Sequence, residues 1–345
     1  MTPSRRGAAS GRRDSRSAGW LLAGGLVAGV LADAVAGDPA AGHPVAVFGR
    51  AATALERRVY ADRRRPGTLY TAGSVLMAAG PAVVATRLAR ASPAGELALT
   101  AATTWAVTGA RSLAAHAARI EAALAAGDLP AARRALPSLV GRDPAALDVA
   151  GITRAVVESV AENTSDAIVA PLLWGALAGP AGLVGYRAAN TLDAMVGHHS
   201  PRYERFGWAS ARLDDVASWL PAKVTALLTA ACAAAVGGNP GRTWRVAARY
   251  GPRHPSPNAG WCEGAFAGAL GVRLGGPLSY AGRVEHRPAL GTGRPPGPAD
   301  IARAIRLSRA VTAAATGLAA ALTVGTCRPI PGRSRPGGQP SRPGD

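Results

Sequence analysis

A stripe of charged side chains runs through the string ITRAVVESVAENTSD, which begins at Ile152. Arg154, Glu158, Glu162 and Asp166 recur at every fourth position, so a helix places them on one face. A plain surface ion pair explains the first two equally well. The last two are carboxylates one turn apart, and they repel each other. A magnesium ion or a cationic substrate would relieve this repulsion, because magnesium binds one or two carboxylates together with phosphate oxygens.

A second group of carboxylates lies at the edges of apolar segments. Asp193 follows one such segment, and Asp214 and Asp215 precede the next. Carboxylates at such edges are costly unless they have partners, so a functional role is expected. An interfacial ion pair with Arg212 is the alternative. The adjacent histidines of VGHHS would point in different directions on a helix or strand, which argues against a joint metal site.

Two further strings bring polar residues to turns. In SPNAGWCEG, prolines hold the chain extended around Ser256, and Asn258 and Glu263 follow. Backbone amides of such a Gly-rich segment can cradle a phosphate, although an ordinary surface loop explains the string equally well. In GDPAAGHPV, His43 lies just outside the first apolar segment. A lone histidine in such a place is more often a structural hydrogen-bonding group than a catalyst.

Several common designs are excluded by the sequence. A Walker A loop needs a lysine, but the only lysine, Lys223, lies in LPAKVT, and GTGRPPG lacks the GxGxxG spacing. The 3 cysteines are widely spaced and form no CxxC pair, so neither a disulfide framework nor a zinc knuckle is expected. The net charge of +18 comes from arginines at the termini and between apolar segments, which argues against a nucleic-acid partner.

Apolar helices must position these polar strings. The chain of 345 residues is 48% hydrophobic and 17% charged. Several stretches approach the length of about 17 to 25 residues that a bilayer crossing requires. They are residues 20–37, 69–88, 94–109, 167–186, 216–236 and 308–326. We therefore predict an all-α fold, that of a multi-pass helical membrane protein with long polar loops that carry the motifs.

The expected organisation is a single helical membrane domain over residues 19–327, flanked by disordered basic tails at 1–18 and 328–345. Loops are expected at 37–68, 111–165, 187–215 and 237–306. Within these loops, helices are expected at 111–126 and 129–136, and a third helix should begin at Pro144 with Asp143 as its cap. The Gly- and Pro-rich residues 237–300 are expected to hold short elements at most.

The apolar stretches impose a geometric constraint on a single site. If all of them crossed the membrane, the motif loop at 190–215 would lie opposite the loops before and after it. One site could not then use all three loops. We therefore expect the stretch 167–186, which is interrupted by Gly179, Pro180 and Gly182, to be re-entrant.

The order of the polar strings resembles one protein family. GDP, HPV, GRD, AVVESVAENTSD, NTLDAMVGH, RLDDVASWLPA, SPNAGW and GALGVRLGGP together resemble the CobD/CbiB family of cobalamin biosynthesis, adenosylcobinamide-phosphate synthase, over residues 31–307. The resemblance implies an integral membrane enzyme that uses ATP and magnesium. The enzyme would join adenosylcobyric acid to (R)-1-aminopropan-2-ol or its O-phosphate through an amide bond. Either an acyl phosphate or an adenylate could serve as the activated acid.

The resemblance also implies roles for residues of these strings. The carboxylates expected to hold magnesium, and through it ATP, are Glu158, Glu162, Asp166, Asp214 and Asp215. The arginines expected to stabilise charge on the transferred group are Arg142, Arg154 and Arg212. The residues expected to position substrate amides are Asn163, Asn190, Ser256 and Asn258. The candidates for the general base that accepts a proton from the amine are Asp193, Glu263 and His43.

The expected setting is the cell membrane, with the motif loops on the cytoplasmic face because ATP is cytosolic. Expected partners are the corrinoid and amine substrates, membrane lipid and other membrane-bound enzymes of late cobalamin synthesis, with no nucleic acid. The main alternative is a multi-pass transporter or scaffold protein, which the apolar stretches permit equally well. A transporter would place its polar motifs at mid-membrane rather than in loops.

Overall fold

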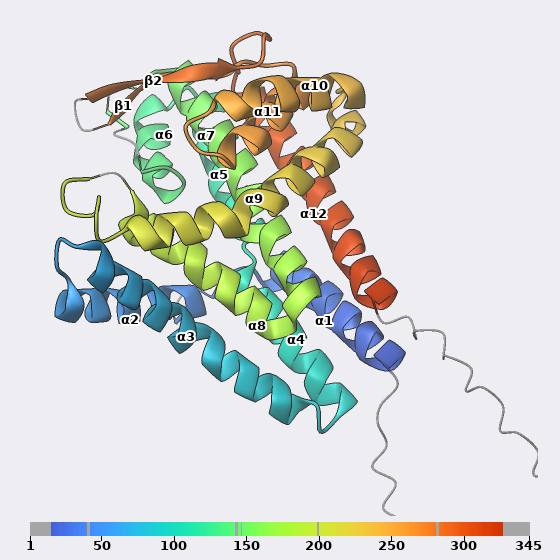
Figure 1. Ribbon diagram of the computed structural model, residues 1–345. Coiled ribbons are helices and arrows are strands. Elements are labelled where there is room, and N and C mark those ends of the chain that lie inside the picture. Colours follow the sequence, from blue (N-terminus) through green and yellow to red (C-terminus); the bar gives the residue numbers. More distant parts are fainter. Residues whose placement is uncertain are drawn as a thin grey trace, which may run out of the picture.

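Helices make up nearly all of the regular structure (Figure 1). The computed structural model describes residues 15–39, 42–141, 144–145, 147–198, 200–280 and 283–326. Arg142, Asp143 and most of both predicted tails lie outside these residues. The elements are α1 Ser15–Ala36, α2 Pro44–Val59, α3 Arg64–Ala89, α4 Pro93–Val107, α5 Ala110–Ala125, α6 Leu129–Ala135, α7 Val149–Thr164, α8 Ala170–Leu192, α9 Trp208–Ala231, α10 Pro240–Tyr250, α11 Ala259–Leu270, β1 Leu274–Tyr280, β2 Arg283–Leu290 and α12 Ala299–Thr326.

The apolar helices identify a multi-pass membrane protein. Within the described residues, 4 helical runs are long and apolar enough to cross a bilayer, namely Ser17–Ala36, Arg64–Ala89, Val149–Gly197 and Ala299–Gly325. In α3 only 17% of the apolar window is buried, and Leu69, Leu76 and Leu88 are largely exposed. A water-soluble protein rarely exposes so much contiguous apolar surface. The all-α membrane fold predicted from the sequence is therefore confirmed.

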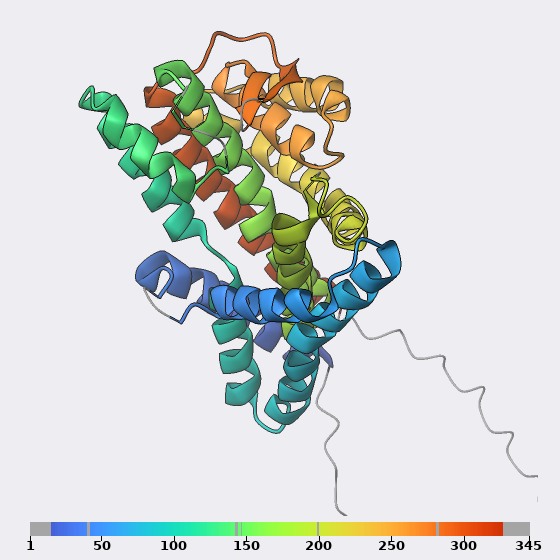
Figure 2. The same ribbon diagram turned by 90° about the vertical axis from the view of Figure 1, so that its left-hand side faces the viewer.

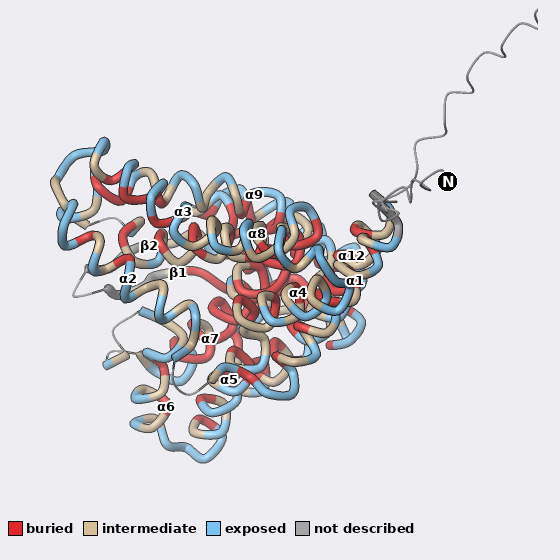
Figure 3. Tube along the Cα trace, turned by 90° about the horizontal axis from the view of Figure 1, so that it is seen from below, coloured by how far each residue is buried: buried red, intermediate tan, exposed pale blue. Residues whose placement is uncertain are grey.

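Helix α7 forms the centre of the molecule and carries the first motif inward. From Gly151 to Ala161 every residue of α7 except Arg154 is buried, and Figure 3 shows α7 largely in the buried class. Ile152 and Val156 of α7 share one core with Phe266 of α11 and Ile305 of α12. The motif side chains of α7 are thus held in a well-packed interior.

The long run reverses direction at Gly179. Gly179 has φ 61° and ψ −151°, a conformation that is essentially restricted to glycine. After the reversal, the Leu183 side chain packs against Gly175, so closely that a Cβ on Gly175 would lie 2.8 Å from Leu183 Cδ2. The apolar stretch at 167–186 therefore does not run straight through the molecule. Both of its ends lie on the same side, as the prediction of a re-entrant segment requires.

The helix ends gather at two opposite ends of the bundle. We define the tail end by a cavity whose walls come from the start of α1, the α3–α4 turn, the break in α8 at Gly179 and Pro180, and Thr323 near the end of α12. The motif end, at the opposite side in Figure 1, holds α5, α6, α7, α10, α11 and the hairpin, and α9 runs across the middle of the molecule. Figure 2 shows α2 lying across the bundle. The end of α7, the end of α8 and the start of α9, which carry three of the motif strings, therefore lie together, because the π-turns after α7 and α8 both pack against α9.

Several local expectations are wrong. The stretch 216–236 lies within α9 or just after it. Its last residue lies at the motif end, where Arg303, in the first turns of α12, donates to Val236 O at 2.9 Å. Residues 237–300 form α10, α11 and an antiparallel β1–β2 hairpin instead of one long loop. The expected loop at 37–68 contains α2. Helix α7 begins at Val149 with Asp148 as its cap, not at Pro144.

Candidate functional site

Two π-helical turns present the first two motifs. The turn Ser165–Val169 follows α7 within ENTSD, and the turn Asp193–Gly197 follows α8 within NTLDAMVG. A π-turn inserts one residue into the helix and redirects the side chains around it, and such turns occur frequently at functional sites. Asp166 lies in the first turn and Asp193 in the second. Because α8 reverses at Gly179, these two turns come together.

Five carboxylates form what we call the acid cluster: Glu162, Asp166, Asp193, Asp214 and Asp215. The charges of Asp214, Glu162 and Asp193 all act on Asp166, and those of Asp214, Asp215 and Glu162 act on Asp193. In a straight helix the 27-residue separation of Asp166 and Asp193 would correspond to about 40 Å. The reversal of α8 is thus the feature that assembles the cluster.

Asp214 is held by neutral hydrogen-bond donors. Asn190 Nδ2 donates to Asp214 Oδ1 at 3.2 Å, and Ser218 Oγ donates to the same oxygen at 3.4 Å. Burial, with a contribution from the charge of Asp215, raises the pKa of Asp214 from 3.8 to about 6. Asp214 therefore exchanges a proton close to neutral pH. Asp215 instead accepts a hydrogen bond from Arg212 at 3.0 Å.

Asn258 contributes a polar side chain at the edge of the cluster. Its Nδ2 donates to the backbone oxygen of Asp215 at 3.0 Å, and the residue is only 7% exposed. Its Oδ1 is buried and has no hydrogen-bond donor among the residues described. Ser256 Oγ shapes the turn by accepting from the backbone N–H of Asn258 at 3.3 Å and of Ala259 at 3.1 Å. A buried oxygen without a donor is suited to a bound cation or an N–H group.

The motif stripe on α7 divides between two places. Glu158 is 3% exposed and accepts from the backbone N–H of Gly275, at the start of the hairpin, at 2.7 Å. Arg154 and Arg273 line a separate cavity of about 500 Å³ between the start of α7 and β1. Glu162 and Asp166 occupy the other half of the stripe, in the acid cluster. The alternative that Arg154 and Glu158 form a plain surface ion pair does not fit, because Glu158 is buried.

The other predicted residues have structural partners outside the cluster. Glu263 meets His254 in the interior, with 3.9 Å between Oε1 and Nε2. His43 caps α2 by accepting from Val45 N at 3.2 Å, and its Nε2 lies 3.5 Å from Asp38 Oδ1. Asn163 Nδ2 donates to the backbone oxygen of Ser159 one turn earlier at 2.9 Å. These positions do not test the roles proposed for the residues.

The acid cluster fits magnesium in its donor chemistry. Within the described residues, no three His, Cys, Asp or Glu side chains lie close enough to form a ready-made metal site. Magnesium does not need such a site when phosphate oxygens and water complete its coordination, because one or two carboxylates are enough. A cation would relieve the repulsion that Asp214, Glu162 and Asp193 exert on Asp166.

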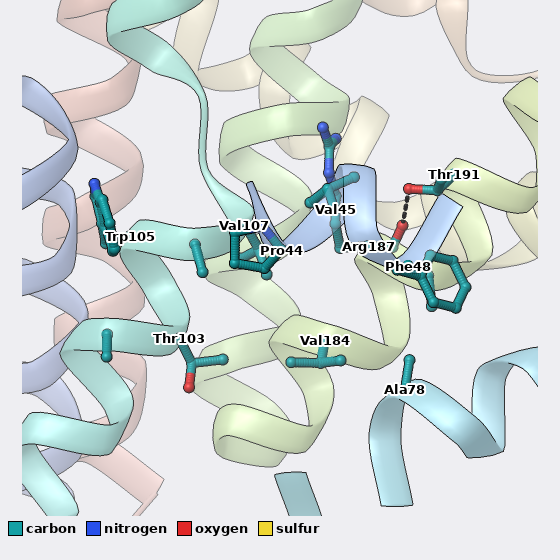
Figure 4. A pocket seen from close by; sticks show the side chains of 13 residues that line it. Pro44, Val45, Phe48, Ala78, Thr103, Trp105, Val107, Val184, Arg187 and Thr191 are labelled. Atoms are coloured by element: carbon teal, nitrogen blue, oxygen red, sulfur yellow. Dashed lines mark hydrogen bonds between the residues drawn. The ribbon is translucent and has the colours of Figure 1, made fainter. Parts of the chain in front are cut away.

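A cavity adjoins this network and contains an arginine that the sequence analysis did not select. It has a volume of about 400 Å³ and lies between α2, α3, α4 and α8. Figure 4 shows its apolar side chains, among them Val45, Phe48 and Val184, together with Arg187 and Thr191. We call it the Arg187 cavity. The signal for Arg187 was weak, because it lies inside an apolar stretch, one helical turn before Asn190 of NTLDAMVG.

Comparison with known proteins places this arrangement of motifs in context. The family described as "CobD/Cbib protein" matches residues 26–308. "Cobalamin biosynthesis protein CobD" of Mycobacterium tuberculosis (strain ATCC 25618 / H37Rv) is 52% identical over 280 residues, which cover 81% of this chain and 88% of that protein. The protein of the same name from Chromobacterium violaceum is 43% identical over 287 residues, covering 81% and 90%. The one from Rhodobacter capsulatus is 51% identical over 216 residues, covering 61% and 67%. No solved structure matches.

Proposed function

The chain belongs to the CobD/CbiB family of cobalamin biosynthesis proteins, and from this premise we propose that it is an amide synthase of the adenosylcobinamide-phosphate synthase type. It would use ATP to join adenosylcobyric acid to (R)-1-aminopropan-2-ol or its O-phosphate. The observation that carries this proposal is the acid cluster, which draws its residues from three of the strings on which the resemblance rests. Several carboxylates held close together are suited to binding a metal ion that in turn binds phosphate oxygens.

Magnesium would bind at the acid cluster, with Glu162, Asp166, Asp214 and Asp215 as its candidate ligands. When bound, magnesium would neutralise charge on the ATP phosphates and so make the phosphorus that the acid attacks more electrophilic, whether the activated acid is an acyl phosphate or an adenylate. The carboxylates of this chain would hold the nucleotide in place, and Arg212, next to Asp215, would stabilise negative charge at the edge of the cluster. Amide formation from a free carboxylate is uphill in water, so the acid must first be activated in this way.

The amine must lose a proton when it attacks the activated acid. Of the three candidate bases, Asp193 belongs to the acid cluster, whereas Glu263 is only 2% exposed and meets His254. His43 caps α2 with Nδ1 and has Nε2 near Asp38. We therefore favour Asp193 as the base. Gly197 supports this role, because a Cβ at position 197 would overlap the Asp193 carboxylate.

The proposed setting is the cell membrane, with the motif end facing the cytoplasm, where ATP is available. Membrane lipid would surround the apolar surface of α1 and α3. The product remains part of a corrinoid that further enzymes must extend, so association with other membrane-bound enzymes of the late pathway is part of the proposal.

The test is an amide-formation assay on the purified protein in detergent or nanodiscs, with adenosylcobyric acid, ATP, Mg²⁺ and each form of the amine. We expect Glu162→Gln and Asp215→Asn to lower turnover by roughly 100-fold or more, as losses of charge-stabilising groups commonly do. Asp128→Asn is the matched control, because Asp128 is an exposed cap of α6 and asparagine also caps helices. Absence of any ATP-dependent amide with the unaltered protein would refute the assignment.

A further inference from the structure

An exposed cluster of arginines surrounds the turn between α2 and α3. The cluster draws on the end of α2, the start of α3 and the loop before α9. We call it the basic rim, and its members, all exposed, are Arg57, Arg58, Arg63, Arg64, Arg65, Arg202 and Arg205. The carboxylates of the same segments are Glu56, Asp62 and Glu204. The rim therefore presents a clear excess of positive charge at the surface.

Contacts between the α2–α3 turn and the loop before α9 hold the rim together. Arg202 Nη2 lies 3.1 Å from Glu56 Oε1, and Arg205 Nη1 lies 3.8 Å from Asp62 Oδ2. Tyr60 Oη donates to the backbone oxygen of Arg202 at 2.9 Å. Two of the three carboxylates are thus taken by the loop arginines. The rim arginines of α2 and α3 themselves form no ion pair within the described part of the chain.

The rim lies where a lipid-facing helix begins. Helix α3 is long and apolar enough to cross a bilayer, and most of its apolar window is exposed. Leu69 and Leu76 are each 69% exposed, and Arg65 lies on the same face of α3, one turn before Leu69. An arginine at the end of such a stripe keeps its stem along the apolar surface and extends its charge into the headgroup layer.

An exposed tryptophan lies at the same level. Trp208, the first residue of α9, is 40% exposed, and the guanidinium carbon of Arg64 lies 5.1 Å from the centre of its ring. Tryptophan is enriched where a membrane meets water. The loop before α9 packs directly on the start of α3, because a Cβ on Gly67 would overlap the backbone oxygen of Phe206. Both segments of the rim therefore share one level of the molecule.

Interactions within the protein do not account for the arginines at the start of α3. Arg63 is the cap residue and Arg64 and Arg65 begin the helix, with no acidic residue in the first turn. Cations at this end of a helix are disfavoured by the helix dipole. The three cavities described above contain no rim arginine in their walls. The rim is thus an open charged surface, which suits a layer of many anions better than one enclosed ligand.

We propose that the basic rim binds the anionic headgroups of membrane phospholipids and so fixes the α2–α3 turn and the start of α9 at the membrane surface. Clusters of about four to eight basic residues beside a membrane-spanning helix suit such lipids. Thr71 Oγ1 and Ser210 Oγ lie 2.8 Å apart, which ties α3 to α9 one helical turn before Asp214. The rim therefore anchors a helix that contributes to the acid cluster, and this inference does not depend on the reaction that the cluster performs.

Lipid titration of the full-length protein in mild detergent tests the proposal. Native mass spectrometry measures binding of phosphatidylglycerol, which is anionic, and of phosphatidylcholine, which has no net charge. The rim variant carries Arg57→Gln, Arg58→Gln, Arg63→Gln and Arg65→Gln. We expect the unaltered protein to prefer phosphatidylglycerol and the rim variant to bind this lipid roughly tenfold or more weakly, because each arginine near the headgroups adds to the attraction.

A control variant removes the same charge elsewhere. It carries substitutions at exposed positions of α5, α6 and α10, namely Arg119→Gln, Arg134→Gln, Arg245→Gln and Arg249→Gln. We expect this variant to keep the preference for phosphatidylglycerol. If the unaltered protein shows no preference, or if the rim variant and the control variant bind the two lipids equally, the proposal is overturned.

Lysine at the four rim positions guards against misfolding of the glutamine variant. It keeps the charge, so most of the preference for phosphatidylglycerol should remain; loss of the preference in the lysine variant would show that the charge is not its cause. Inorganic pyrophosphate at constant ionic strength separates a lipid surface from a soluble phosphate. We expect it not to displace the lipid, and complete displacement would assign the rim to a soluble anion instead.

Photo-crosslinking in the intact membrane separates a lipid from an acidic protein. Val59, at the end of α2, is 37% exposed, so Val59→p-benzoylphenylalanine places a photoreactive group beside the rim without removing an arginine. We expect the main adduct of the irradiated protein to have the added mass of a phospholipid. A protein as the main adduct would overturn the assignment of the rim to lipid.

Discussion

Asp214 makes the stability of the folded protein depend on pH in a defined direction. Burial and the charge of Asp215 raise its pKa from 3.8 to about 6, so the folded state binds a proton more tightly than the unfolded state. Between these two values the folded state gains stability as the pH falls. Above pH 6 the charged carboxylate costs up to about 3 kcal/mol, since one pKa unit corresponds to about 1.4 kcal/mol.

Asp214→Asn should therefore stabilise the metal-free protein at pH 7.5 by about 1 to 3 kcal/mol and give almost no gain at pH 4. Asparagine keeps an oxygen that can accept from Asn190, so the hydrogen bond of 3.2 Å is retained. Thermal unfolding in detergent with EDTA at the two pH values measures the difference. A stabilisation of the same size at both pH values would show that the charge of Asp214 is not its cause.

Residue types and spacing predicted the carboxylates of the acid cluster but not their neighbours. Glu162 and Asp166 were recognisable because two carboxylates four positions apart on a helix repel each other. Arg187 gave no comparable signal, because a single arginine within an apolar stretch also suits an interfacial anchor. Arg187 donates to Asn190 Oδ1 at 3.3 Å, and only three-dimensional packing brings its charge close to Asp166. The two π-turns were likewise hidden, because they depend on hydrogen-bond choices within a continuous helix.

At the scale of elements, the reversal of α8 is the step that assembles the site. Gly179 adopts φ 61° and ψ −151°, and a side chain at that conformation is strained by about 1 to 3 kcal/mol. We expect Gly179→Ala to lower the melting temperature and to reduce amide formation, because Asp193 would no longer be held against Asp166. Gly317→Ala in α12 is the control, since nothing lies within 4 Å of a Cβ there. If Gly179→Ala and Gly317→Ala changed the melting temperature and the rate of amide formation equally, the reversal at Gly179 would not be what assembles the site.

The reversal could be predicted from the sequence, whereas the elements between residues 237 and 300 could not. Gly179, Pro180 and Gly182 together marked the break, whereas Gly80 and Pro81 lie within the continuous helix α3, so a Gly–Pro pair alone does not predict a reversal. In contrast, α11 is built from small residues, and its Gly264 and Gly268 pack directly on the backbone of α10 at Ala247 and Thr243. Glycine disfavours an isolated helix, so this pair of helices is stabilised by tertiary packing. The cap formed by Asn239, which accepts from Arg242 N at 2.9 Å, was the available local signal.

At the scale of the whole molecule, the bundle separates chemistry from the chain ends. The beginning of α1, the α3–α4 turn, the break in α8 and the end of α12 surround one cavity at the tail end. The acid cluster lies away from this cavity, where α7 and α8 end and α9 begins (Figure 1). Arginines occur both in the two terminal segments of the sequence and in residues 50–65, so the charge bias does not select an orientation. We therefore assign the orientation of the bundle in the membrane from the side on which ATP, the proposed nucleotide substrate, is available.

Reporter fusions in the intact membrane would test this arrangement. Fusions after Arg142, Arg205 and Arg283 should all report the cytoplasm, because each follows or precedes a segment of the motif end. Fusions at Arg90, in the α3–α4 turn, and at the C-terminus should report the opposite side, because α3 and α12 end beside the same cavity. If Arg205 and Arg142 fell on different sides, α8 would cross the membrane without reversing. Asp166 and Asp193 would then lie on different sides, and neither the acid cluster nor a single active site could exist.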